Sequence, residues 1–188
     1  MTQPPPYFER VRRKATERWD QLERDSELAA PWHQLFRQVQ SPRHVLSELI
    51  QNADDAGATE ASVRIEEGAF VFEHNGKDFT EEQFESLCRF GFSNKRHLHT
   101  IGFRGIGFRS VFSLGDAVEV YSPTLAVRFH RSRFTEPQWL EDGISGDGRT
   151  LIRVPLRDEL VREELEERIR TWIDAPLLGS RIESVPFA

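Results

Sequence analysis

Three polar side chains recur along one short segment at a spacing that suits a metal and nucleotide site. The segment Glu48–Ala56 reads ELIQNADDA and contains Glu48, Asn52 and Asp55. At about 100° per residue, these three side chains fall on one face of a helix. An acid beside a neutral amide oxygen fits a hard cation that shares phosphate oxygens. Taken alone, the same grouping is also typical of the solvated face of an amphipathic helix.

A second segment, about fifty residues further on, favours an anion. The run 102–108 reads GFRGIGF and directly precedes the apolar positions Val111 and Phe112. Closely spaced glycines let backbone N–H groups approach an anion, and a following helix N-terminus adds donors and the positive end of its dipole. The pattern therefore predicts a phosphate loop, although it is neither the Walker motif nor G-x-G-x-x-G.

The charge distribution indicates an anion site in the same region. No Asp or Glu occurs from Ser86 to Gly115, in a chain that has 31 acids and a net charge of −6. The cations in this window are Arg89, Lys95, Arg96, Arg104 and Arg109. Because a protein that binds a nucleic-acid backbone usually carries a much more basic domain, nucleic acid is not indicated as a partner.

These motifs together resemble the ATP-binding domain of the GHKL superfamily (gyrase, heat-shock chaperone, histidine kinase, MutL), most closely its sacsin-like and NO VEIN-like branch. ELIQNADDA resembles the N-box, and IGFRGIGFRSVF resembles the glycine-rich phosphate motif, in the same order. Between them, HNGKDFT at 74–80 stands where the family has Asp-x-Gly-x-Gly, and GRTLI at 148–152 resembles the late Gly-Thr strand. The resemblance covers about residues 35 to 156 and implies the Bergerat fold.

The resemblance also implies roles for individual residues. Asn52 is implied as the Mg²⁺ ligand, Glu48 as the general base that orients the attacking water, and Asp55 as a supporting group at the helix end. The segment from about 90 to 106 is interpreted as a lid that orders when nucleotide binds. The residues implied to hold the phosphates are Gly102, Arg104, Gly105, Ile106, Gly107 and Phe108, mainly through their backbones, with Lys95 neutralising charge.

The adenine motif departs from the family pattern. His74 or Asn75 stands where most members have the Asp that accepts the adenine amino hydrogen, and Asp78 replaces the second glycine, whereas Gly76 is kept. A neutral His or an Asn carbonyl can accept that hydrogen bond, and Thr150 can bind the same edge directly or through water. ATP remains the expected nucleotide, with a weaker expectation of selectivity against GTP.

The pattern of elements predicts an α+β two-layer sandwich, with helices on one face of a mixed, mostly antiparallel sheet. Ser41 and Pro42 favour the start of the motif helix and Gly57 its end. The predicted helices are 7–28, 30–40, 42–56, 81–87 and 158–173, and the predicted strands are 61–65, 69–72, 117–122, 125–130, 149–156 and 181–185. The glycine segment is expected to lead into a further helix.

Residues 1–40 are interpreted as a helical lead-in, 41–175 as the ATP-binding domain and 176–188 as the start of a following element of a longer chain. With 38% hydrophobic residues, the chain supports one core. The single cysteine, Cys88, excludes an internal disulfide. Because the sequence contains neither a secretory segment nor a long apolar run, we expect a cytoplasmic protein without membrane contact.

Three functions are compatible with these features. The first is a slow Mg-ATPase that acts as a conformational or dimerisation switch, and the second is a module that binds ATP or ADP without hydrolysis. The third, phosphoryl transfer to a protein, is disfavoured because no phosphoacceptor-histidine helix pair follows. Glu48 favours the first over the second, since a pure binder has no use for a base. The partners implied are the nucleotide, other domains of the same chain and a nucleotide-dependent homodimer.

Overall fold

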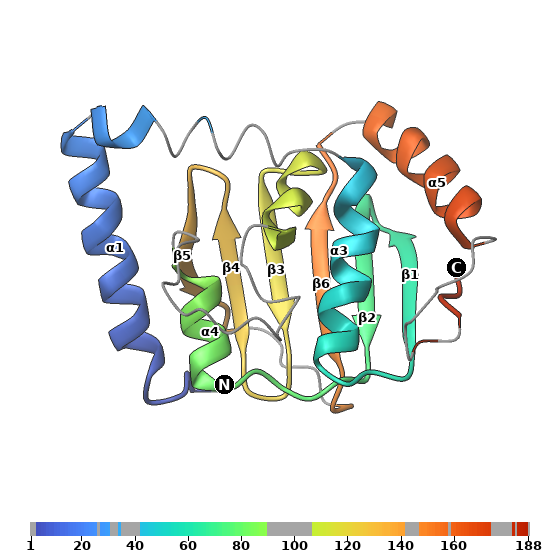
Figure 1. The fold of residues 1–188 in the computed structure, drawn as a ribbon, viewed down its shortest axis with the longest axis horizontal. Helices are drawn as coiled ribbons and strands as arrows, with labels where there is room; N and C mark the ends of the chain where they lie inside the picture. Colours follow the sequence, from blue (N-terminus) through green and yellow to red (C-terminus); the bar gives the residue numbers. More distant parts are fainter. Residues whose placement is uncertain are drawn as a thin grey trace.

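The computed structural model describes residues 3–25, 27–30, 34, 42–89, 107–141, 147–157, 159–173, 182 and 184–187. Within them, a six-stranded sheet carries helices on one face (Figure 1). The predicted α+β fold class is therefore confirmed.

The sheet has the strand order β1-β2-β6-β3-β4-β5. Every pairing between these strands is antiparallel. The predicted parallel component is limited, among the described residues, to an isolated bridge between Val63 and Phe187. The strands are β1 (Ala61–Glu66), β2 (Ala69–His74), β3 (Ala117–Tyr121), β4 (Ala126–His130), β5 (Arg133–Trp139) and β6 (Thr150–Pro155).

Strand β5 was not predicted from the sequence. Its segment, RFTEPQW, lacks a regular alternation and contains Pro137. Proline removes a ladder donor, so it is tolerated only on edge strands or at bulges. Here β5 is the edge strand, and its pairing with β4 is irregular between Arg128 and His130. The proline thus has a position that the strand order allows.

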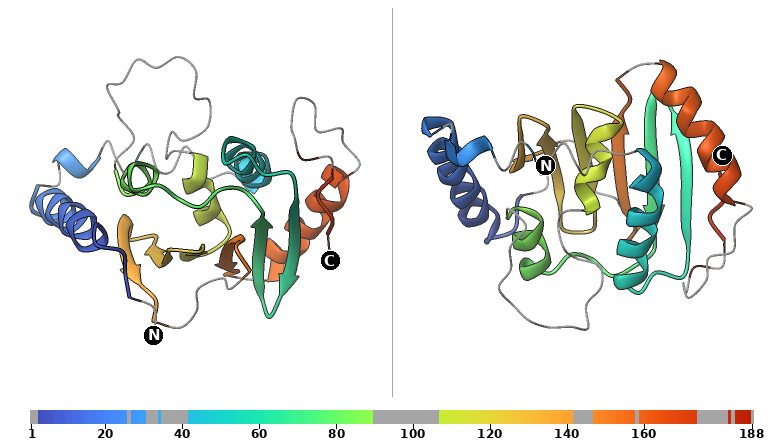
Figure 2. Two further views of the ribbon diagram at one scale, coloured as in Figure 1. Left: turned by 90° about the horizontal axis from the view of Figure 1, so that it is seen from below. Right: turned by 45° about the horizontal axis from the view of Figure 1, so that its top comes forward.

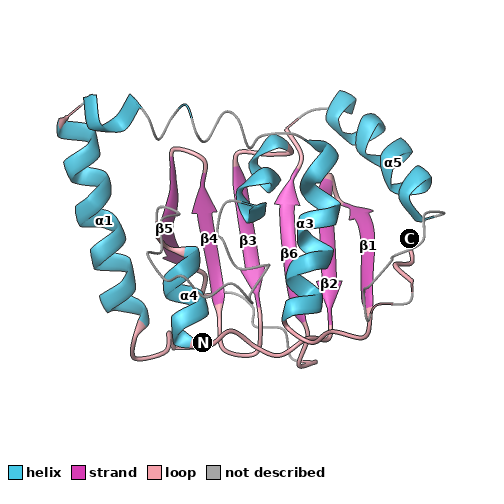
Figure 3. Cartoon of the chain, viewed as in Figure 1, coloured by secondary structure: helices cyan, strands magenta, loops and turns pink. Residues whose placement is uncertain are grey.

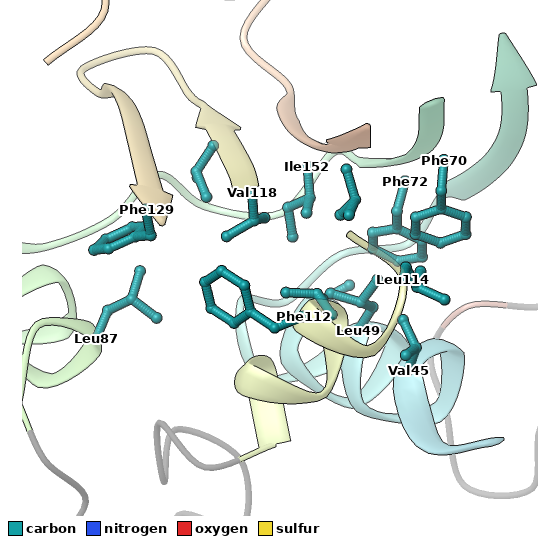
Figure 4. Packing of buried hydrophobic residues seen from close by; sticks show 14 of the residues in the cluster. Val45, Leu49, Phe70, Phe72, Leu87, Phe112, Leu114, Val118, Phe129 and Ile152 are labelled. Atoms are coloured by element: carbon teal, nitrogen blue, oxygen red, sulfur yellow. The ribbon is translucent and has the colours of Figure 1, made fainter. Parts of the chain in front are cut away.

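Three helical elements lie over one face of the sheet: α3 (Pro42–Asp55), α4 (Glu81–Leu87) and η1 (Gly107–Ser113) (Figure 2). Their apolar side chains meet those of the strands in one core. Figure 4 shows Val45 and Leu49 of α3 and Phe112 of η1 facing Phe72 and Ile152 of the sheet. The predicted helix after the glycine segment is a short 3₁₀ helix.

Two longer helices flank this layer at the sheet edges, as Figure 3 shows. Helix α1 (Phe8–Arg24) packs on β5, where Trp19 Nε1 donates to Thr135 Oγ1 at 2.9 Å within the core. Helix α5 (Glu159–Ile173) contacts α3 and buries Leu165 and Ile169. The predicted helical lead-in therefore contributes to the same core as the motif helix.

The opposite face of the sheet is polar. Glu119, which alternates with the buried Val118 and Val120, accepts hydrogen bonds from Arg128 at 2.6 Å and from Arg153 at 3.1 Å. Cross-strand ion pairs of this kind suit a sheet face that is not covered by helices. The apolar face of the sheet is consequently the one that can form a site together with the helix layer.

Two predicted elements differ from the structure or lie beyond it. The helix expected at 30–40 lies outside the described residues, except Ala30 and Gln34. In the segment expected as a strand at 181–185, the described residues Ile182, Ser184 and Val185 have no strand structure, and the bridge to β1 is made by Phe187 instead. Among the described residues, no helix combines the length and apolar composition needed to cross a bilayer.

Candidate functional site

A cavity opens between the helix layer and one end of the sheet. It encloses about 600 Å³, including the part open to solvent. Small-molecule sites are mostly apolar with a few polar groups, and the lining of this cavity has the same character. The apolar lining residues are Leu49, Ala56, Phe79, Leu87, Phe108 and Ile152, and the polar ones are Asn52, His74, Lys77 and Gln83.

Helix α3 and the residue that follows it supply one wall, through Leu49, Asn52 and Ala56. These residues are three and four positions apart, so they form one stripe along the helix. Asn52 is half-buried beside the buried Leu49, and its carboxamide reaches the cavity. The implied metal ligand therefore lies in the wall of the cavity and not on the solvated face of the helix.

The end of α3 is fixed by its backbone. Gly57, at φ +75°, donates to the Asp54 carbonyl at 2.8 Å, and Ala58 donates to the Ala53 carbonyl at 2.9 Å. This pair of bonds around a left-handed glycine is the Schellman motif. The Lys77 N–H then donates to the Ala56 carbonyl at 2.9 Å, so the segment after β2 is held against the helix end.

His74, the last residue of β2, forms the polar floor of the cavity. It is only 5% exposed, and burial lowers its pKa to about 4, so the ring is neutral at neutral pH. Its Nδ1 accepts a hydrogen bond from the Gly76 N–H at 3.1 Å. Of the two residues named for the position of the family Asp, His74 is the one that lines the cavity.

Gly76 permits the close approach of the strand end to α3. A Cβ at this position would lie 2.8 Å from the Ala56 Cβ and 2.9 Å from His74 Nδ1. Both distances are shorter than van der Waals contact, so no larger residue fits without displacing the His74 ring or the end of α3. The glycine is thus required by packing against the site.

Asn75 has a different position from the one expected. Its Oδ1 accepts from the N–H groups of Thr59 and Glu60, both at 2.9 Å, and its Nδ2 donates to Thr59 Oγ1 at 3.0 Å. The side chain is exposed and is not part of the cavity lining. Its carbonyl therefore orders the turn before β1 and does not point to a base.

Asp78, which replaces the second family glycine, bends back on its own backbone. Its Oδ1 accepts from the Phe79 N–H at 2.7 Å. This local bond aligns Phe79, whose ring lines the cavity. The departure at Asp78 is therefore accommodated without placing its carboxylate in the cavity lining.

Thr150 lies beside His74 at the start of β6. The two residues are direct partners in the antiparallel register, and Ile152, two residues further along the same face, lines the cavity. Thr150 is 1% exposed, and its Oγ1 has no hydrogen-bond partner among the described residues. A buried hydroxyl without a partner is costly, so a ligand or water that reaches it is favoured.

Several lining residues were not predicted as site residues: Leu49, Ala56, Lys77, Phe79, Gln83, Leu87 and Ile152. For Gln83 alone the sequence offered a local signal, the spacing of a capping box with Thr80. The Thr80 N–H donates to Gln83 Oε1 at 2.9 Å, and the Gln83 N–H donates to Thr80 Oγ1 at 3.2 Å. This cap fixes the start of α4 next to the cavity. Its place in a wall follows only from the packing of α4 against the sheet.

The two acids predicted on α3 are placed differently from Asn52. Glu48 is half-buried one turn before Asn52 and is not among the lining residues. Asp55 is largely exposed at the last position of α3. Its pKa is raised, mainly by partial desolvation of the carboxyl group and to a smaller extent by the charge of Asp54. The backbone motif caps the helix end without the Asp55 side chain.

The phosphate motif is described only at its end. Gly107 begins η1, and the half-buried ring of Phe108 lines the cavity, which brings this end next to α3 and α4. The other predicted phosphate residues, Lys95, Gly102, Arg104, Gly105 and Ile106, and the lid segment 90–106 lie outside the described residues.

Two of the cations that indicated an anion site have structural contacts within the protein. Arg109 is 3% exposed, donates to the Arg89 carbonyl and lies over the Phe134 ring, with its Cζ 4.8 Å from the ring centroid. Burial lowers its pKa to about 10. Arg89 pairs with Glu85 at 2.8 Å. Arg109 thus anchors η1 to the end of α4 and to β5, and is not an exposed phosphate ligand.

The donor set suits a cation that is shared with a ligand. Among the described residues, no three His, Cys, Asp or Glu side chains lie close enough together to hold a metal ion. Mg²⁺ commonly uses one or two protein oxygens and completes its shell with phosphate oxygens and waters. The Asn52 carboxamide in the cavity wall fits that use.

The fold and the cavity define a two-layer α+β domain with a site between α3 and the sheet. The sequence profile described as "Histidine kinase-, DNA gyrase B-, and HSP90-like ATPase" matches residues 40–161. The chain belongs to this family. Its motif order and its six-stranded antiparallel sheet agree with that membership.

Similar proteins include Protein NO VEIN of Arabidopsis thaliana (35% identical over 92 residues) and Sacsin of Homo sapiens (28% over 115 residues). DNA mismatch repair protein MutL of Herminiimonas arsenicoxydans is 37% identical over 86 residues. These matches cover 46%, 50% and 40% of this chain, but only 3%, 2% and 14% of the respective relatives. The chain therefore corresponds to a small part of each relative.

Proposed function

We propose that this domain binds ATP with Mg²⁺ in the cavity between α3 and the sheet, hydrolyses it slowly, and acts as a nucleotide-driven switch in a larger multidomain protein. The observation that carries the proposal is that Asn52 and His74 both line one mostly apolar cavity. Asn52 offers an oxygen to a cation, and His74 offers a polar group to a base. Family membership supports ATP as the nucleotide.

The walls of the cavity suit a purine. Phe79, Phe108 and Ile152 provide apolar surface against which a flat base can pack, while His74 offers a polar group for its edge. Thr150, with its unpartnered hydroxyl, lies beside His74. Bound Mg²⁺ would supply charge neutralisation at the phosphates, and the residues predicted to hold those phosphates are Gly102 to Phe108 with Lys95.

Hydrolysis needs a base in addition to binding. In the proposed mechanism the Glu48 carboxylate accepts a proton from the attacking water, one helical turn from the ligand Asn52. A Lys or Arg supplied by another domain or by a second copy would speed the reaction, which is why the isolated domain is proposed to be slow. Dimerisation driven by nucleotide follows from the same requirement.

A second function, binding without hydrolysis, is favoured by one specific observation. Glu48 is half-buried but does not line the described cavity, whereas Asn52 does. A regulatory module that senses ATP or ADP would need only the binding residues. The two functions share their nucleotide site and differ in the role of Glu48.

The test combines calorimetry with ATP and ADP, with and without Mg²⁺, and phosphate release by the same samples. Asn52→Ala is expected to lower Mg-ATP affinity at least tenfold through the loss of a charge-assisted contact, about 1.4 kcal/mol or more. The matched control is Gln138→Ala, which removes an exposed carboxamide on β5 and should leave affinity unchanged.

Glu48→Gln keeps the size of the side chain and removes the base, so it should bind Mg-ATP normally while phosphate release falls by a hundredfold or more. Glu163→Gln, an exposed position on α5, is its control. Undiminished phosphate release by Glu48→Gln would remove Glu48 from the mechanism. Absence of release by the parent protein despite binding would favour the non-hydrolysing module, and absence of heat with either nucleotide would refute both functions.

A further inference from the structure

His74 has one ring nitrogen committed to the protein. The Gly76 backbone N–H lies 3.1 Å from Nδ1 and donates to it. A backbone N–H cannot act as an acceptor, so Nδ1 must be the unprotonated nitrogen of the ring. In a neutral imidazole the proton is then on Nε2, which is therefore a donor.

The tautomer is enforced by the packing around it. Gly76 lies close against the end of α3, since a Cβ there would be 2.8 Å from the Ala56 Cβ, and the following Lys77 N–H donates to the Ala56 carbonyl at 2.9 Å. The donor to Nδ1 therefore belongs to a backbone segment pinned against the end of α3. Among the described residues, the ring makes no other hydrogen bond, so Nε2–H is available to a ligand in the cavity.

The two neighbouring side chains that could accept a hydrogen bond both bond to backbone N–H groups. Asn75 Oδ1 accepts from two backbone N–H groups, and Asp78 Oδ1 accepts from a third. Neither side chain is part of the cavity lining. Where the family places a carboxylate that accepts a hydrogen bond, the described floor of this cavity presents an N–H that donates one.

This reversal changes which base edge the site complements. Adenine carries an amino donor at C6, and a 6-oxopurine (hypoxanthine or guanine) carries an oxygen acceptor there. At C6, the Nε2–H would meet the adenine amino group donor against donor, whereas a 6-oxo group would accept from it directly. The neighbouring N1 of adenine can also accept, whereas N1 of a 6-oxopurine carries a proton. The Thr150 hydroxyl can donate or accept, so it adapts to either base and does not discriminate between them.

We propose that His74 is the base-selecting residue of the nucleotide site and donates from Nε2 to an acceptor on the purine edge, so that the domain binds 6-oxopurine nucleotides at least as tightly as adenine nucleotides. This inference rests on the nucleotide site proposed above. It concerns the base only, and leaves the roles of Asn52 and Glu48 unchanged.

The sharpest test compares ATP with inosine triphosphate by calorimetry in the presence of Mg²⁺, because their bases differ only in the C6 substituent and the N1 proton that accompanies it. The parent protein is expected to bind inosine triphosphate at least as tightly as ATP. His74→Asp restores an acceptor and should shift the ratio of the two dissociation constants toward ATP by about tenfold or more. The control His130→Asp, on β4 away from the cavity, should leave the ratio unchanged.

A second measurement reports the tautomer of His74 directly and does not depend on His74→Asp. The ¹⁵N spectrum of the imidazole groups, assigned to His74 by its loss in His74→Gln, should show a neutral ring protonated at Nε2. A ring protonated at Nδ1 would overturn the inference, even if His74→Asp fails to fold.

The outcomes separate the two proposals. If the parent binds ATP more tightly than inosine triphosphate, the inference about His74 fails while the nucleotide site stands. If the parent binds neither nucleotide, the proposed function fails, and the inference fails with it.

Discussion

Replacing Gly76 with alanine is expected to disrupt the site through a single methyl group. The added Cβ would lie 2.8 Å from the Ala56 Cβ, 2.9 Å from His74 Nδ1 and 3.2 Å from the Ala56 carbonyl oxygen. The φ angle of Gly76 is not in the left-handed region, so the conflict is one of space. Either the His74 ring or the end of α3 must move.

The magnitude follows from these contacts. Forcing a methyl group into a packed site costs about 1–3 kcal/mol, and displacing the ring also loses the Gly76 N–H to Nδ1 bond, about 1 kcal/mol. For a chain of 188 residues, 1 kcal/mol lowers Tm by about 2–4 °C. The two costs together are about 2–4 kcal/mol, and the lower end of this range already lowers Tm by about 4–8 °C. Because both displaced groups line the cavity, nucleotide affinity should also fall at least tenfold.

Gly68→Ala provides a control with a similar effect on stability but no effect on the site. Gly68 has φ +71°, and no atom lies within 4 Å of the place that a Cβ would occupy, so alanine there suffers only the left-handed backbone, about 1–2 kcal/mol. Gly68 lies in the turn between β1 and β2, remote from the strand end at His74. Thermal unfolding and calorimetry with Mg-ATP would be measured on both variants and on the parent.

The two variants should be destabilised to a similar degree and differ in binding. If Gly76→Ala binds nucleotide as tightly as Gly68→Ala does, the close approach of the strand end to α3 does not shape the site. If Gly76→Ala also unfolds no earlier than the parent, the steric reasoning itself is refuted.

Two further predictions concern stability. Gly115→Ala should be more severe than Gly76→Ala, since its Cβ would lie 2.0 Å from the Pro155 carbonyl oxygen, which belongs to the backbone of β6 and cannot rotate away; a denaturant midpoint equal to that of the parent would contradict this. His74 should make stability fall as pH drops from about 6.5 to about 4, because the unfolded chain binds a proton in that window and the folded chain does not. The contribution of the neutral His74 ring to the free energy of unfolding, about 3 kcal/mol, is fully present above pH 6.5. In His74→Gln, the free energy of unfolding, measured with urea at each pH, should therefore fall less steeply toward low pH. An equally steep fall in this variant would refute the assignment of the pH dependence to His74.

The sequence was sufficient where local chemistry determines the element. The predicted start of the motif helix at Pro42 and its end before Gly57 match α3, and Gly57 has the positive φ that a C-terminal glycine requires. The predicted helix 81–87 matches α4, because Thr80 and Gln83 form a cap that depends only on neighbours in the chain. These features are encoded within a few residues of where they act.

The sequence was insufficient where an element depends on distant partners. The sequence of β5 lacks the alternation that predicts a strand. The strand is stabilised by pairing with β4 and by packing against α1, whose Trp19 is hydrogen-bonded to Thr135. By residue type Arg109 is one of several cations around an anion site, yet tertiary packing buries it against Phe134. Sequence periodicity and counts of charged residues depend on residue type alone, so they cannot predict that Arg109 packs against a residue more than twenty positions away.

Within the site, one short motif also combines features set by neighbouring residues with features set by distant ones. Residues 74–76 carry a local signal for a turn, and from their types alone both His74 and Asn75 could accept a hydrogen bond. The fold assigns each a different task, since Asn75 Oδ1 is used by the turn before β1 and His74 Nδ1 is used by Gly76. The same glycine that allows β2 to approach α3 thereby orients the ring that faces the cavity. The shape of the cavity and the hydrogen-bond donor that His74 presents to it consequently depend on the same glycine. A substitution at Gly76 should change both together.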